Sequence, residues 1–162
     1  MTDTDFSKID FRNALGSFAT GVTVITALGE NGQKIGMTAN SFSSVSLDPA
    51  LVLWSIGRDS NCFDDFMAAQ AYAIHVLADD QQDVSNRFAK TGADRFDGLS
   101  ITEGFSGVPL LPHYSSCFQC TIAHHYDGGD HVILVGKVIE FTDHGLKPLI
   151  FHRGGYTEIS AD

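Results

Sequence analysis

The chain has 162 residues, 43% of them hydrophobic and 19% charged, which suits one compact domain with its own core and is too short for two. With 20 acidic against 10 basic residues, its formal net charge of -10 disfavours nucleic acids and anionic membranes as partners. No apolar run approaches the roughly 20 residues of a membrane span, the amino terminus is acidic and the 3 cysteines are an odd count, so we expect a cytoplasmic protein with no membrane partner.

The amino-terminal segment is predicted to hold a flexible tail over residues 1–9 and a short helix over residues 10–18. Phe11, Leu15 and Phe18 fall at helical spacing and would form one apolar face. An amphipathic helix is therefore expected to begin the folded domain.

Three strands are predicted next, because their sequences are rich in β-branched and apolar residues. Residues 21–27 enter a hairpin at the turn formers of residues 29–32, and a second strand follows over residues 34–46. After an Asp-Pro pair, residues 50–56 (ALVLWSI) are apolar almost throughout, which is typical of a strand covered on both faces. This strand is expected at the centre of the sheet.

Two further short helices flank another strand in the middle of the chain. Ser60 is a good N-cap for a helix over residues 61–70, which carries acidic residues near its positive end. Residues 72–78 are strand-like, and the aspartate pair that follows can cap a helix through residue 89.

A long loop rich in glycine and charge continues to residue 107 and precedes the last strands. Residues 116–126 and 131–141 are joined by Asp-Gly-Gly-Asp at 127–130, a strong hairpin signal, and residues 149–152 supply a final strand. About seven strands, with short helices and no regular alternation of strand with long helix, favour an antiparallel barrel over a doubly wound sheet. The fold class is therefore predicted as mainly β.

The densest polar cluster lies in residues 36–46 (GMTANSFSSVS), where small hydroxyl and amide side chains occupy an expected barrel wall. A wall of small side chains lets a flat ring approach backbone N–H groups. The alternative is an exposed strand edge whose Ser and Thr side chains face water, and composition alone favours that alternative.

The segments at residues 21–26 (GVTVIT) and 36–49 (GMTANSFSSVSLDP) resemble the signature of the flavin reductase-like family, the small reductase components of two-component monooxygenases. The resemblance continues through Ser60, residues 72–77, Phe88-Ala89, residues 129–136 (GDHVILVG), residues 148–151 (PLIF) and Gly155-Tyr156. It covers nearly the whole chain from about Phe11 onward. A single flavin reductase-like domain is therefore expected over residues 1–162.

The resemblance implies an FMN-binding split β-barrel that forms a homodimer, with the flavin at or near the subunit interface. It implies FMN or FAD and NADH or NADPH as cofactors, and a flavin-dependent monooxygenase component as a partner. The residues it places at the edge of the flavin ring are Met37, Thr38, Ala39, Asn40 and Ser41. Those it places at the ribityl or phosphate end are Ser55, Ser60 and Asn61, with Phe88, Ala89 and Lys90 closing the pocket.

His131 starts a strand directly after a hairpin turn, which sets an imidazole at the barrel rim. The resemblance makes it the residue that contacts the nicotinamide cofactor, with Tyr156 a weaker candidate for the same surface. A solvated rim histidine is the alternative.

Ser60 and Asn61 open a predicted helix, where free N–H groups and the helix dipole favour a phosphate. Arg58 could add a charge-assisted contact to that phosphate. The alternatives are a simple helix cap and an exposed arginine.

The spacing of Cys117, Cys120, His124, His125 and His131 also suggests zinc. In an extended strand, however, residues three apart point to opposite faces, so the two cysteines could not share a metal ion. No metal site is therefore predicted, and Cys120 is expected to face the core as a small hydrophobe.

The predicted function is hydride transfer from reduced nicotinamide to FMN or FAD, with the reduced flavin supplied to a partner monooxygenase. FMN is favoured as the bound flavin, and the scarcity of Arg and Lys near His131 favours NADH. Neither a Rossmann fingerprint nor a P-loop occurs in the sequence. The alternative is a flavin- or haem-binding barrel without turnover.

Overall fold

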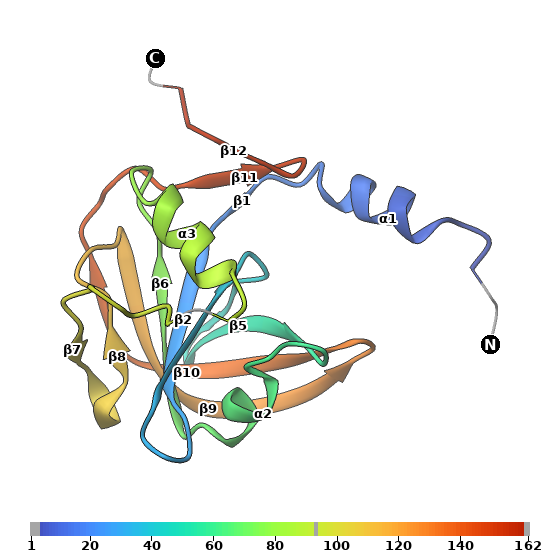
Figure 1. Cartoon of the computed structure of the whole chain (residues 1–162). Helices are drawn as coiled ribbons and strands as arrows, with labels where there is room; N and C mark the ends of the chain where they lie inside the picture. Colours follow the sequence, from blue (N-terminus) through green and yellow to red (C-terminus); the bar gives the residue numbers. More distant parts are fainter. Residues whose placement is uncertain (1–3, 93, 161–162) are drawn as a thin grey trace.

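The computed structural model describes residues 4–92 and 94–160, and within them a seven-stranded antiparallel sheet forms the body of the protein (Figure 1). The strands are β1 (Thr20–Gly21), β2 (Thr23–Leu28), β3 (Lys34–Ala39), β4 (Ser43–Leu47), β5 (Ala50–Gly57), β6 (Ala71–Val76), β7 (Thr102–Glu103), β8 (Pro109–Leu110), β9 (Ser116–Gly128), β10 (His131–Asp143), β11 (Ile150–His152) and β12 (Gly155–Thr157). The helices are α1 (Lys8–Leu15), α2 (Phe63–Ala68) and α3 (Gln82–Ala89), with a 3-10 turn at Phe105–Gly107.

The main sheet has the order β3-β2-β6-β9-β10-β5-β4, so β3 and β4 are its two edge strands. The long strands β9 and β10 each carry irregular register, and such bulges increase local twist and bend. In Figure 1, β2 and β6 run upright while β5 and β10 run across the view, which shows how strongly the sheet coils. The mainly β, antiparallel split-barrel fold predicted from the sequence is confirmed.

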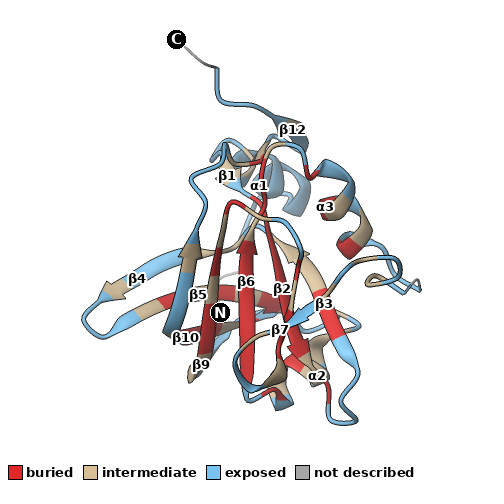
Figure 2. Ribbon diagram, turned by 90° about the vertical axis from the view of Figure 1, so that its left-hand side faces the viewer, coloured by how far each residue is buried: buried red, intermediate tan, exposed pale blue. Residues whose placement is uncertain are grey.

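The core lies on both faces of the central strands, as the buried segments of β2 and β6 in Figure 2 show. Consecutive residues of β2 alternate between clusters, because successive strand side chains point to opposite faces. Ile25 packs in the cluster around Trp54 and Tyr72, whereas Val24 packs in the cluster around Phe88. Burial of β-branched and aromatic side chains on two faces stabilises this part of the sheet.

Two predictions about strands are wrong. Strand β5 is not central, because it lies between β10 and the edge strand β4. Its residues alternate between buried and half-buried, so the apolar run covers the core on one face only. The single strand predicted over residues 34–46 is broken into β3 and β4.

The helices differ from prediction at their amino termini. Helix α1 begins at Lys8, because the Ser7 Oγ accepts hydrogen bonds from the N–H groups of Ile9 and Asp10. It therefore overlaps the tail predicted over residues 1–9, of which residues 1–3 lie outside the described part. Helix α2 begins at Phe63, and Ser60 is not its N-cap.

The two cysteines of the candidate zinc motif lie in different core clusters. Cys120 packs with Trp54 and Tyr72 inside the barrel, as predicted, and Cys117 packs on the opposite face. Burial raises the pKa of each thiol to about 12. Both behave as small core residues at neutral pH.

No helix within residues 4–92 and 94–160 combines the length and the apolar character that crossing a bilayer requires.

His75 is a fully buried histidine on β6. Its Nε2 accepts a 3.1 Å hydrogen bond from the Leu111 N–H, so the proton is on Nδ1, which donates to the Val24 carbonyl at 3.0 Å. Desolvation lowers the pKa of this imidazole to about 4.

This histidine predicts acid sensitivity of the fold. Below the unfolded pKa of about 6.5 the unfolded chain binds a proton that the folded chain excludes, so the free energy of unfolding decreases down to about pH 4. The full decrease is about 3 kcal/mol. Urea denaturation at several pH values in this window measures it. A His75→Gln variant should lose that part of the pH dependence, and identical profiles for both proteins would contradict the assignment.

Candidate active site

The barrel is open between its two edge strands, and the chain crosses this opening at residues 40–42, between β3 and β4. Ser41 anchors the crossing, because its Oγ accepts from the Ser55 N–H at 2.9 Å and donates to the Ser55 carbonyl at 3.1 Å. The cluster of small polar residues noted in the sequence therefore lies at the mouth of the barrel. Among the described strands, none pairs with the outer side of the β3 backbone there.

A pocket of about 210 Å³ lies beside this open edge, walled by β3, α3 and the β11–β12 hairpin. Its lining residues are Val22, Thr38, Ala39, Asn40, Ser85, Ala89, Phe151 and Tyr156. Five of the predicted site residues meet here, although Thr38 and Tyr156 are far apart in the sequence. The lining is small, polar or flat, which suits a planar heterocycle that contacts backbone amides.

A hydrogen-bond network holds the Tyr156 ring against the pocket. The Tyr156 hydroxyl donates to Asn86 Oδ1 at 2.9 Å and lies 2.7 Å from Ser85 Oγ. Thr38 Oγ1 donates to the Ser85 carbonyl at 2.6 Å, which ties β3 to α3. Neither Ser85 nor Asn86 was predicted from the sequence as a site residue. Ser85 could have been found, because it lies four residues before Ala89 on the predicted helix and so shares its face.

A second pocket of about 240 Å³ contains Asn61, near the start of α2. The helix has only six residues and no side-chain cap, so its dipole gives weak support for a phosphate. Arg95 and Lys34 also line this pocket and supply positive charge, which Asp94 in the same lining partly offsets. Arg95 donates to the Gly36 carbonyl at 2.6 Å and to the Lys90 carbonyl at 2.7 Å, so it joins the long loop to β3 and to the end of α3.

Ser60 and Met37 lie together at the margin of this second pocket. Ser60 Oγ accepts from the Cys62 N–H at 3.2 Å and lies 3.9 Å from the Met37 sulfur. Met37 also packs against the barrel core. Burial raises the pKa of the Cys62 thiol despite the neighbouring Arg95, so no reactive thiolate is indicated.

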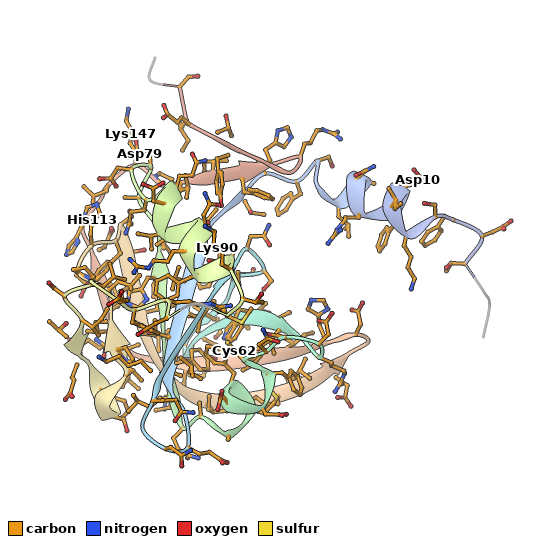
Figure 3. The ribbon with its side chains drawn as sticks, viewed as in Figure 1. Asp10, Cys62, Asp79, Lys90, His113 and Lys147 are labelled. Atoms are coloured by element: carbon orange, nitrogen blue, oxygen red, sulfur yellow. The ribbon has the colours of Figure 1, made fainter. Side chains whose placement is uncertain are left out.

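Phe88 does not reach the surface, and the prediction that it contacts a ligand is corrected. Its side chain is completely buried and packs edge-on against Phe96, with ring centroids 5.1 Å apart. Gly36 permits this approach, since a methyl group there would lie 2.8 Å from the Phe88 ring. Ala89 lines the pocket directly, and Lys90, labelled in Figure 3, is exposed at the end of α3.

Arg58 is bound to the β9–β10 hairpin, away from the two pockets. Its Nη2 pairs with Asp127 at 2.7 Å and its Nε donates to the Gly129 carbonyl at 3.0 Å. Arg58 therefore supports the hairpin that carries His131, and its contact with a phosphate stays a prediction. Asp127 lies 69 positions from Arg58 in the sequence, so the local sequence around Arg58 does not reveal this ion pair.

His131 lies at the rim, half-exposed, as the sequence predicts. Its Nδ1 lies 2.7 Å from Asp130 Oδ1, and this hydrogen bond lowers the pKa of the Asp130 carboxyl. Nε2 faces Gly57, where a methyl group would lie 3.7 Å away. His131 does not line the pocket beside Thr38, so any ligand that touches both must extend across the barrel mouth.

The chain is similar in sequence to curated flavin reductases and reductase components of monooxygenases. A reductase component of the flavin-dependent trigonelline monooxygenase of Acinetobacter baylyi is 47% identical over 91% of this chain and 47% of its own. The FMN reductase (NADH) SmoA of Agrobacterium fabrum is 47% identical over 93% of this chain and 85% of its own. The chain spans about half the length of the first two curated relatives it matches.

Among solved structures, the NADH:FAD oxidoreductase SgcE6 of Streptomyces globisporus, in complex with NAD and FAD fragments, superposes with a TM-score of 0.91. It is 35% identical, and the match covers 100% of this chain and 98% of that chain. The model of the flavin reductase like domain matches residues 15–160. This extent, together with the identity to SmoA, shows that the chain belongs to the flavin reductase like domain family.

Proposed function

We propose that this protein is an NADH-dependent flavin reductase that binds FMN or FAD at the mouth of its barrel. The observation that carries the proposal is the pocket of about 210 Å³ between the open edge of β3, α3 and Tyr156. Small residues at positions 38–40 leave room for a flat ring, and the edge-strand backbone supplies hydrogen-bonding groups without a strand partner. SmoA, named as an FMN reductase using NADH, supports FMN as the flavin.

When bound, the flavin supplies the hydride acceptor for the reduced nicotinamide. The protein binds and orients the two cofactors, and the hydride transfer needs no acid or base residue from it. Backbone N–H groups in the segment from Thr38 to Ser41 would hold the flavin and would stabilise the negative charge that it gains on reduction. His131 Nε2 is available to the nicotinamide carboxamide, and the Asp130 hydrogen bond fixes the imidazole orientation.

The reduced flavin is proposed to leave for a separate flavin-dependent monooxygenase component. The trigonelline monooxygenase relative is named as a reductase component, which supports such a partner. The chain is proposed to act as one flavin reductase-like domain in the cytoplasm, consistent with its 3 free cysteines.

The proposed subunit arrangement is a homodimer, supported by an apolar face on β4, β9 and β10. Phe42, Phe118 and Phe141 form a row of stacked rings with centroids 5.7 and 6.3 Å apart. Phe141 is 66% exposed and Leu47 is 98% exposed, and an interface on this face would remove both side chains from water.

Placing a charge in this face should separate the subunits. Phe141→Glu buries a carboxylate in the proposed interface, so we expect a monomer with an unchanged circular dichroism spectrum. Sedimentation equilibrium measures the mass. The matched control is Glu103→Gln, an exposed residue on the small β7–β8 sheet. A wild-type protein that is already monomeric would contradict the homodimer.

Steady-state NADH consumption with catalytic protein and excess FMN tests the function itself. A reductase turns over many times per chain, because the flavin product leaves and is replaced. A barrel that only binds flavin would give stoichiometric reduction or none, and that result would refute the proposal. His131→Ala should raise the KM for NADH while FMN binding, followed by flavin fluorescence, is retained.

A further inference from the structure

A larger pocket, of about 810 Å³, adjoins the first one and has no role in the function proposed above. It lies where the carboxyl-terminal end of α1 meets the β11–β12 hairpin, and in Figure 1 α1 extends outward from the tip of this hairpin. Asn40 and Phe151 line both pockets, so the two adjoin. A ligand with its ring in the first pocket can extend into the second.

Two arginines line this larger pocket, Arg12 from α1 and Arg153 from the β11–β12 turn. Arg12 and Arg153 have no carboxylate within 4.0 Å in the part of the chain that the structure describes. None of the acidic residues within 4–92 and 94–160 lines the pocket, although the whole protein has a formal charge of -10. Against that negative background, the pocket presents local positive charge.

Arg153 occupies a backbone position that does not favour arginine. The turn between His152 and Gly155 has two residues, Arg153 with φ 47° and Gly154 with φ 78°. Positive φ at both positions is the geometry of a type I′ turn, which prefers Asn-Gly. The Arg153 N–H donates to the Gly16 carbonyl at 2.8 Å, which holds the turn against the end of α1. The Arg153 side chain is therefore a candidate for a functional role.

We propose that Arg12 and Arg153 bind the diphosphate bridge of a dinucleotide whose ring lies in the adjoining pocket. This inference rests on the proposed function, since it names the part of the ligand that the larger pocket holds. A guanidinium matches phosphate oxygens in bidentate geometry, and two of them suit a doubly charged bridge. Asn13 and Asn40 add amide groups to the same wall.

NADH and FAD both contain a diphosphate bridge, and the corresponding mononucleotides lack it. The test therefore compares dinucleotides with mononucleotides. Arg12→Gln and Arg153→Asn are made singly and together, and affinities are measured for FAD and FMN by flavin fluorescence. KM values are measured for NADH and for reduced nicotinamide mononucleotide. The charge-matched control is Lys147→Gln, at the far end of the protein from α1 in Figure 3. Asparagine suits the turn, so Arg153→Asn should have an equal or higher Tm.

The double variant should bind at least one dinucleotide about tenfold more weakly, with the mononucleotides changed less than about twofold. A higher KM for NADH with unchanged FAD affinity assigns the diphosphate site to the nicotinamide cofactor. A higher Kd for FAD with an unchanged KM for NADH assigns it to the flavin. Equal weakening of mononucleotides and dinucleotides, or no change relative to Lys147→Gln, would overturn the proposal. A wild-type protein that fails to oxidise NADH would refute the proposed function instead, while the binding comparison would still test this site.

Discussion

Replacing Ala89 with tryptophan should reduce the kcat/KM for flavin reduction on the order of 100-fold or more, with the protein still folded. Ala89 ends α3 and lines the pocket of about 210 Å³ beside Thr38 and Tyr156. An indole at this position would occupy the space proposed for the flavin ring. The residue is exposed, so the larger side chain meets the pocket and solvent, not packed core.

Gln82→Trp is the matched control for this variant. Gln82 is exposed at the other end of the same helix and does not line the pocket. Both variants place a tryptophan on α3, so a general effect on the helix would appear in both. NADH consumption with FMN measures the difference. Near wild-type activity of Ala89→Trp would place the flavin elsewhere.

Gly136→Ala should destabilise the fold by about 3 kcal/mol. A methyl group on this residue of β10 would overlap the Tyr72 hydroxyl and lie 2.9 Å from the Cys120 Cβ. Tyr72 is fully buried and packs against Trp54, so its ring cannot move into solvent. Relief of the overlap requires displacement of core side chains or of the β10 backbone.

The control for this substitution is Gly21→Ala on β1, where a methyl group would have no atom within 4 Å. Its effect should be within about 0.5 kcal/mol. Urea denaturation of both variants gives the two free energies of unfolding. Equal stabilities of the two variants would show that the core around Tyr72 is looser than the structure indicates.

Much of the fold is readable from the sequence, because strand composition and turn residues act locally. The hairpin at residues 127–130 joins β9 and β10 as expected. Where prediction fails, distant contacts decide the outcome. The apolar run of β5 suggests a central strand, but its place beside β4 follows from pairing with β10, and sequence periodicity does not encode that pairing.

In the candidate site too, local sequence predicts the placement of some residues, and distant contacts decide that of the others. Thr38, Ala39 and Asn40 lie at the barrel mouth, where their small side chains suggested a ligand. Arg58 pairs with a hairpin carboxylate that the local sequence does not reveal, and Phe88 is enclosed by the core. Side-chain partners set by tertiary packing are not visible in local patterns.

An equilibrium titration of FMN, followed by flavin fluorescence, tests the central claim that the pocket at the barrel mouth holds the flavin ring. The wild-type protein should give saturable binding with one site per chain, and Ala89→Trp should weaken it on the order of 100-fold. Unaltered binding by the variant, or no binding by the wild type, would contradict the account.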